Sequence, residues 1–180
     1  MGTGKNGTFD KVPDLSQWSI LVTYEGDLTL KDQFGSFILK WFDFFCKNQT
    51  IYLLKPIEGH GLWDKKKVFG DLPPTTDYEG EIAVLTRATI RLNKLRYFWK
   101  NVAPIASQMA TAEGFITSYG VGEIPWVKQA TFSVWESKAM MKKFAYRMPK
   151  HKAVIQKTRK QDWYSEDMFT RFTIQQKIEK

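Results

Sequence analysis

The chain has 180 residues, enough to bury a sizeable core, and its 27 basic and 19 acidic residues give a formal net charge of +8. The basic residues are scattered, with the densest run at 65–67, and no basic cluster is interleaved with aromatic residues, which excludes a typical nucleic-acid groove. The single cysteine, Cys46, excludes an intrachain disulfide and a cysteine-rich metal site.

The first 57 residues show part of an α+β repeat. A glycine-bearing turn at Gly2 and Gly4 precedes a strand predicted over 18–24 (WSILVTY), a helix over 31–48 and a strand over 50–57. This β-α-β order lacks the strand and helix that should open the repeat. Two explanations stay open: the chain begins late, so that Met1 is an internal residue, or a shortened protein closes its first sheet with a partner chain.

Residues 58–80 are rich in glycine and proline and are predicted to form a linker. His60 lies in this segment between two glycines, and we expect it to be an exposed loop residue.

Residues 81–175 are predicted to form a complete repeat. The segment 81–90 alternates as a strand, with Ile82 and Val84 on one face and Arg87 on the other. The other elements follow in order: a helix over 92–110 that buries Leu92, Leu95, Phe98, Trp99 and Val102, strands over 114–123 and 127–136, helical turns over 137–147 and 149–161, and a strand over 167–174. The order β-α-β-β-α-β predicts an α+β fold of ferredoxin-like repeats in one compact domain.

His151 is the most informative candidate for a site. Helical spacing places it on an apolar stripe with Val154 and Ile155, and Pro149 suits the first turn of that helix. A titratable imidazole that faces a core is either a hydrogen-bonded core residue or a ligand of a metal or haem iron. The residues alone leave both readings open.

Arg87 and Arg171 lie on strands that are neighbours in a ferredoxin-like unit. Two guanidinium groups on adjacent strands could bind paired carboxylates such as haem propionates. The alternative is that each arginine pairs with a local acid such as Glu81 or Glu136.

Trp135 and Tyr119 are candidates for a ligand pocket. Trp135 shares a strand face with small polar residues, and Tyr119 stands beside the glycine turn at 120–122. Both could line a pocket for a flat, apolar ligand, or they could simply pack in the core.

Three segments together resemble the spheroidene monooxygenase family of bacterial carotenoid ketolases: LTRATIRLNKLRYFW (85–99), GFITSYGVGEIPWVKQATFSVW (114–135) and FAYRMPKHKAVIQKTRKQDWYSEDMFTRF (144–172). The similarity extends to residues 2–24. The resemblance implies repeats of the dimeric α+β-barrel type, compatible with a homodimer, and a haem-dependent oxygenase. Such an enzyme uses dioxygen and an electron donor to oxidise an acyclic carotenoid. The family histidine of the third segment matches His151, which the resemblance therefore implies as the haem-iron ligand.

Hydroxylation followed by formation of a ketone is the leading expectation for the reaction. Two other readings keep the fold: a cofactor-free enzyme of the antibiotic-monooxygenase type, and a non-catalytic module that binds haem or a lipophile. The sequence shows neither an apolar run of about 18 residues nor a signal-peptide pattern, so we expect a cytoplasmic protein. A carotenoid substrate and the charge of +8 would bring it to the inner face of a membrane.

Overall fold

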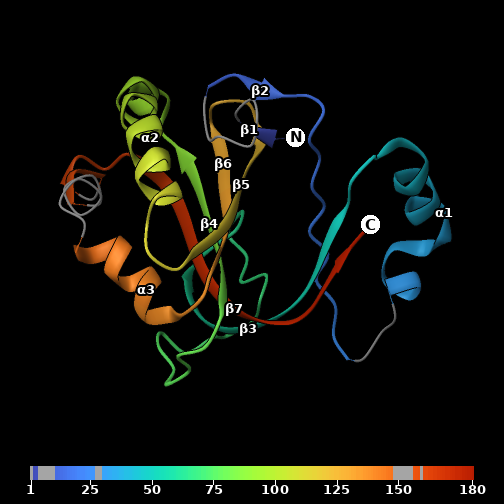
Figure 1. Ribbon diagram of the computed structural model, residues 1–180. Helices are drawn as coiled ribbons and strands as arrows, with labels where there is room; N and C mark the ends of the chain where they lie inside the picture. The colour runs from blue at the N-terminus through green and yellow to red at the C-terminus, as the bar shows by residue number, and fades with distance from the viewer. Residues whose placement is uncertain (1, 4–10, 27–29, 148–155, 159) are drawn as a thin grey trace.

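The computed structural model describes residues 2–3, 11–26, 30–147, 156–158 and 160–180 (Figure 1). In this part of the chain the strands form one sheet in the order β2-β1-β5-β6-β4-β7-β3. The strands are β1 (Gly2–Thr3), β2 (Pro13–Asp14), β3 (Thr50–Gly61), β4 (Ile82–Ile90), β5 (Phe115–Ile124), β6 (Lys128–Trp135) and β7 (Tyr164–Glu179). The helices are α1 (Leu30–Phe45), α2 (Leu95–Ala110) and α3 (Lys138–Lys142), with a 3₁₀ turn at Leu92–Lys94 and a π turn at Lys143–Arg147.

The complete repeat predicted for the C-terminal half is confirmed. The elements β4, α2, β5, β6, α3 and β7 follow one another, and their strands lie in the antiparallel order β5-β6-β4-β7. This is the ferredoxin-like arrangement, with its first and last strands side by side in the sheet. The fold class is α+β.

Helices α2 and α3 cover one face of this sheet (Figure 1). Beneath them, Ile82 and Val84 of β4 pack with Trp135, Met141 and Phe144. A second cluster under α2 contains residues of the predicted helical stripe, Phe98, Trp99 and Val102. Leu92 is an error of that prediction: it lies in the 3₁₀ turn before α2 and is 74% exposed.

The strand predicted over 18–24 does not form. These residues have no regular secondary structure, and Trp18, Ile20 and Leu21 are exposed. A strand is stable only where its backbone groups find partners, and no neighbouring strand lies against this segment within the described residues. The aromatic and β-branched residues of this segment favour a strand, but no sheet edge in the described structure is available to pair with it.

Strand β3 is longer than predicted and joins the first part of the chain to the second. It pairs antiparallel with β7, from Thr50 opposite Glu179 to Gly61 opposite Met168. The predicted linker 58–80 thus begins inside a strand, because β7 extends far enough to pair with it. His60 is exposed, as predicted, but it lies in β3 and stacks on Phe169 with ring centroids 5.6 Å apart.

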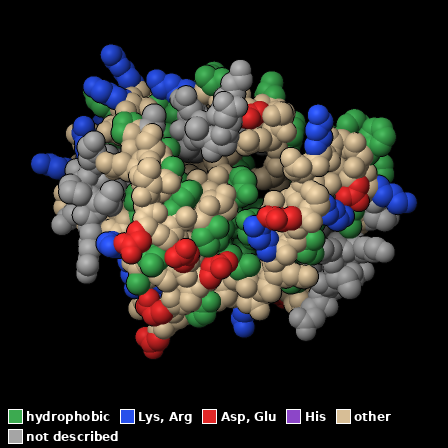
Figure 2. All heavy atoms as spheres, viewed as in Figure 1, with side chains coloured by type: hydrophobic (Ala, Val, Ile, Leu, Met, Phe, Trp, Pro, Cys, Tyr) green, Lys and Arg blue, Asp and Glu red, His purple; other side chains and the backbone are tan. Residues whose placement is uncertain are grey.

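Strands β3 and β7 run away from the helix-covered part of the sheet toward α1, which lies at the far side of the molecule (Figure 1). Helix α1 contains Gly35 at a non-helical φ of 68°. Its exposed side chains include five large apolar residues: Phe37, Ile38, Trp41, Phe44 and Phe45. Apolar side chains are visible at the surface of this end of the molecule (Figure 2). In the described part of the chain, each helix is too short or too polar to cross a membrane.

Candidate functional site

The face of the sheet opposite α2 and α3 carries a second apolar core. The β4–β7 register places Ala83, Leu85 and Arg87 opposite Phe172, Thr170 and Met168. Directly opposed residues of antiparallel strands share a face, so these side chains lie together. We call this surface the Arg87 face. It is covered by side chains that follow β3 rather than by α2 or α3: Trp63, Val68 and Phe69 pack on it.

Arg87 is fully buried on this face and is bound by three carboxylates. Its Nε and one terminal nitrogen donate to the two oxygens of Glu123, at 3.1 and 3.2 Å. The other terminal nitrogen donates to Glu166 at 2.5 Å, and the first also donates to Asp64 at 2.8 Å. Lys128 donates to the same oxygen of Asp64 at 2.7 Å. Each acid comes from a different segment, so one guanidinium joins β5, β7 and the chain after β3.

The residues after β3 form a tight turn that this network holds in place. Trp63 and Lys66 pair as an isolated bridge, and between them Asp64 and Lys65 have φ of 48° and 64°. This left-handed conformation costs side-chain-bearing residues energy unless the surroundings compensate. Here the backbone N–H groups of Asp64 and Lys65 each donate to Glu166 at 2.8 Å. The Trp63 ring lies 5.3 Å from the Arg87 guanidinium, a cation–π distance.

The charges of the network shift the pKa values of its members. Hydrogen bonds from Lys128 and Arg87 hold the pKa of the Asp64 carboxyl below its ordinary value of 3.8. Burial acts to raise the pKa of Glu166, but the two backbone N–H groups and Arg87 outweigh it and lower the pKa. Burial also opposes the charge on Arg87, yet its bonds to Glu123 and Asp64 raise its pKa further. All three groups therefore stay ionised at neutral pH.

Arg171 belongs to a separate buried network under α3. It pairs across strands with Glu58, whose carboxylate is fully buried and contacts the Arg171 guanidinium. The other oxygen of Glu58 accepts from the fully buried Lys138 at 3.2 Å and from the backbone and hydroxyl of Thr76 at 2.7 and 2.9 Å. Lys138 also donates to the Thr76 carbonyl. Burial lowers the pKa of Arg171. Sequence reasoning missed Glu58, because it was assigned to a linker.

The two predicted cofactor-binding arginines therefore do not come together. Arg171 lies opposite Val84, which faces α3, whereas Arg87 lies opposite Met168 on the other face. Each guanidinium is already held by its own carboxylates, as the alternative reading expected, although the partners are not Glu81 or Glu136. Paired haem propionates do not fit this arrangement, since the anions would compete with the acids that already bind each guanidinium and would have to reach both faces of the sheet.

The two predicted pocket residues are also separated. Trp135 is buried under α3, where its indole donates to the Ser133 hydroxyl at 3.0 Å and its ring packs against Phe115 and Phe144. Tyr119 lies opposite Phe132 on the Arg87 face, with ring centroids 6.4 Å apart. Trp135 is thus a core residue in this structure, and Tyr119 alone borders the Arg87 face.

A row of three aromatic rings extends the apolar surface of the Arg87 face. Phe132 is flanked by Tyr119 on one side and by Tyr52 of β3 on the other, at 5.1 Å between centroids. Burial and the neighbouring Tyr119 hydroxyl raise the pKa of Tyr52, so the Tyr52 hydroxyl is neutral at physiological pH. Sequence analysis did not single out Tyr52 or Phe132. The alternation of Tyr52 and Leu54 along the sequence indicates that they share one face of a strand. It does not indicate which strand lies beside them.

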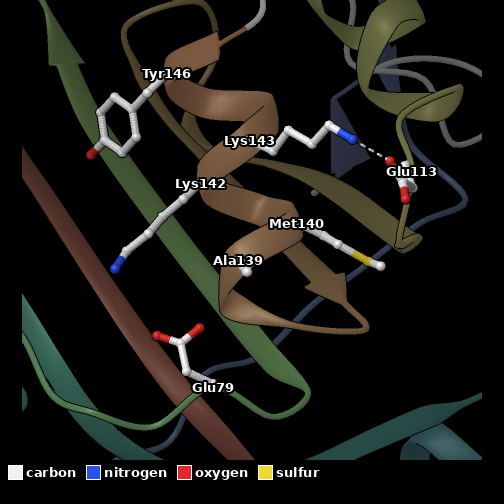
Figure 3. A pocket seen from close by; sticks show the side chains of 7 residues that line it. All are labelled: Glu79, Glu113, Ala139, Met140, Lys142, Lys143 and Tyr146. Carbon is white, nitrogen blue, oxygen red and sulfur yellow. Dashed lines mark hydrogen bonds and ion pairs between the residues drawn. The ribbon is translucent and has the colours of Figure 1, made fainter.

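A pocket of about 550 Å³ lies on the other side of the sheet, beside α3. It is lined by Glu79, Glu113, Ala139, Met140, Lys142, Lys143 and Tyr146 (Figure 3). Lys143 and Glu113 form an ion pair across it. Four charged side chains around an open depression suit a polar ligand better than a long apolar one. None of the predicted site residues that the structure describes lies in this lining.

His151 lies outside the described residues, so its predicted role as a haem-iron ligand remains a prediction. Within the described residues, no group of three or more histidine, cysteine, aspartate or glutamate side chains is arranged to hold a metal ion.

Similarity to known proteins covers almost the whole chain. It is 34% identical over 173 residues to a spheroidene monooxygenase of Rubrivivax gelatinosus and 31% identical over 176 residues to one of Cereibacter sphaeroides, in each case over 96% of this chain. A third, of Rhodobacter capsulatus, is 27% identical over 179 residues. The chain belongs to the spheroidene monooxygenase family.

The chain spans only part of its relatives in this family. It covers 54% of the Cereibacter protein, 66% of the Rubrivivax protein and 73% of the Rhodobacter protein. No family model matches the chain. Among solved structures, it is similar to SnoaB, a cofactor-independent oxygenase from Streptomyces nogalater, with 17% identity and a TM-score of 0.44 over 54% of this chain and 95% of that one.

Proposed function

We propose that this chain is an oxygenase that introduces oxygen into an acyclic carotenoid or a similar apolar substrate. The observation that carries the proposal is the similarity to spheroidene monooxygenases over 96% of the chain. The reaction we propose is hydroxylation of a methylene, repeated at the same carbon and followed by loss of water to give a ketone. Dioxygen and an electron donor would be the co-reactants.

The Arg87 face is the surface of this chain that best suits such a substrate. Its apolar core continues into the row of Tyr52, Phe132 and Tyr119. Flat rings and aliphatic side chains complement a conjugated hydrocarbon, which offers no hydrogen-bonding groups. In contrast, the pocket beside α3 would place charged groups against an apolar chain.

For the cofactor we propose haem, with neutral His151 as the iron ligand, on the strength of the family resemblance alone. Haem iron would supply the activation of dioxygen, while the protein would bind and orient the substrate and exclude water. Arg87 and Arg171 are not part of this proposal, because each guanidinium is already paired with carboxylates of this chain. A carotenoid resides in a membrane, and the charge of +8 favours an anionic surface, so we place the activity at the cytoplasmic side of the membrane.

The test is the visible spectrum of the full chain expressed with haem supply, compared with His151→Ala and with His60→Ala as the matched control. We expect an intense haem band that is lost or displaced in His151→Ala and retained in His60→Ala, since His60 is exposed on β3. The same preparations are then given an acyclic carotenoid, dioxygen and a reductant, with keto products measured by chromatography. Turnover without haem would support a cofactor-free enzyme, and haem without turnover would support a binding module.

A further inference from the structure

Residues 62–70, here called the capping segment, cover the Arg87 face with three apolar side chains. Trp63, Val68 and Phe69 pack on the core of this face, and the Phe69 ring meets Phe172 edge-on at 5.1 Å between centroids. Tyr52 and Phe132 pack on the same core, and Phe132 continues the apolar surface to Tyr119. The segment therefore covers a surface that an apolar ligand could also cover.

Charged hydrogen bonds at the tip fasten this segment to the sheet. Asp64 binds Arg87 and Lys128, and the N–H groups of Asp64 and Lys65 bind Glu166. Asp64 is 53% exposed at the rim, so water can replace these bonds when they break.

Arg87 keeps most of its partners when the capping segment leaves. Glu123 binds it through two hydrogen bonds and Glu166 through a third, and both acids belong to the sheet. The guanidinium would lose Asp64 and the Trp63 ring but would keep two carboxylates, so opening would leave no unpaired buried charge, which would otherwise be costly. An apolar ligand could then replace Trp63, Val68 and Phe69 on the core without having to satisfy a cation.

We propose that the capping segment is a charge-latched cover over the ligand-binding surface, and that Arg87 is the positioning residue that holds it closed. The ligand that displaces it is an apolar conjugated polyene. The ligand class rests on the proposed function, whereas the latch rests on the contacts of Asp64, Glu166 and Arg87 alone.

Trypsin cleaves after lysine, so the three exposed lysines at 65–67 provide a cleavage site inside the capping segment. The full chain, Asp64→Asn and the control Asp71→Asn are compared in two measurements: the rate of cleavage at 65–67 by mass spectrometry, and the rate of uptake of diphenylhexatriene, an uncharged fluorescent polyene. Asparagine tolerates the left-handed conformation of residue 64, so the turn is retained while the charge is lost. Asp71→Asn removes only the exposed ion pair with Lys67.

We expect Asp64→Asn to raise both rates about tenfold, the effect of losing a charge-assisted hydrogen bond, and Asp71→Asn to leave both near the parent values. In the parent, saturating diphenylhexatriene should accelerate cleavage at 65–67, a result that needs no variant. Faster cleavage without faster uptake, unchanged cleavage, or protection by the polyene would each overturn the proposal. Neither measurement uses haem or dioxygen, so failure of the proposed oxygenase activity would leave both results intact.

Discussion

Glu58 shows how much a single buried side chain can connect. Its carboxylate lies on β3, contacts Arg171 of β7, and accepts hydrogen bonds from Lys138 of α3 and from Thr76 in the following loop. Two cations and a backbone N–H thus depend on one acid in a region that water does not reach. Removal of one partner from such a network costs far more than the pairing itself contributes.

Glu58→Gln should therefore lower the free energy of unfolding by about 3 to 5 kcal/mol, because Arg171 would be left without its anion and Lys138 would keep only Glu79, at 3.9 Å. Urea denaturation followed by circular dichroism measures this change. The control is Glu113→Gln, which breaks an ion pair of exposed side chains and should leave the urea midpoint near that of the parent. Equal midpoints for the two variants would show that Lys138 and Arg171 become hydrated when Glu58 loses its charge.

The Arg87 network predicts a loss of stability in acid. Asp64 and Glu166 have folded-state pKa values below their ordinary 3.8 and 4.5, so their contribution is fully present above about pH 5 and is lost as the pH falls through the lowered values. We expect the difference in urea midpoint between the parent and Glu166→Gln to be constant at neutral pH and to shrink below about pH 4. A difference in urea midpoint that grows as the pH falls would contradict the lowered pKa of Glu166.

Sequence reasoning at this scale located charged residues but not their partners. Alternation along residues 81–90 correctly placed Arg87 on the face opposite Ile82 and Val84. The same reasoning could not establish that Arg171 faces the other way, because the relation between β4 and β7 depends on their register, and one residue of slip exchanges the faces.

At the scale of elements, the junction of β3 with the capping segment depends on Gly61. Its φ is +87°, and a Cβ atom there would overlap the backbone oxygen of Asp167 on β7. Strand β3 can therefore turn away at this point only with a residue that has no side chain.

Gly61→Ala should destabilise the protein by about 3 kcal/mol, from the left-handed backbone and the clash with β7 together. Gly70→Ala separates the two effects, since Gly70 has φ +74° but open space around its Cβ position, and should cost only about 1 kcal/mol. Thermal or urea unfolding of both variants gives the comparison. Similar losses for the two would indicate that β7 yields to the added methyl group.

Local patterns predicted the complete repeat because each of its strands has a partner within the repeat itself. The helix over 92–110 and the strands around it have strong periodicity, and the structure confirms them within a few residues. Residues 18–24 have an equally good strand pattern and form none, while β3 and β7 exceed their predicted lengths. The difference is the availability of a sheet edge, which no local pattern encodes.

At the scale of the whole molecule, helix α1 stands out because it exposes five large apolar side chains. Phe37 and Phe44 are 77% and 81% exposed, on a helix at the end of the β3–β7 extension. Aromatic side chains gathered on an exposed helix bind hydrophobic dyes and promote association.

The double variant Phe37→Gln/Phe44→Gln should bind less anilinonaphthalene sulfonate than the parent, while its free energy of unfolding changes by less than about 0.5 kcal/mol. Glutamine keeps the helical propensity, and Lys40→Gln on the same helix is the matched control. Dye fluorescence measures the binding of the dye, and sedimentation velocity measures the association of the protein. Unchanged dye binding would place the apolar binding surface elsewhere on the molecule.

The pairing of Thr50 with Glu179 has a consequence for the order in which the protein is made. Strand β3 leaves the ribosome when its only strand neighbour in the described sheet, β7, has not yet been translated. Until β7 emerges, the nascent chain carries an unpaired strand beside an aromatic helix, and contacts between distant residues form slowly. Translation speed and chaperone supply should therefore govern the yield of folded protein more than the stability of the finished fold does.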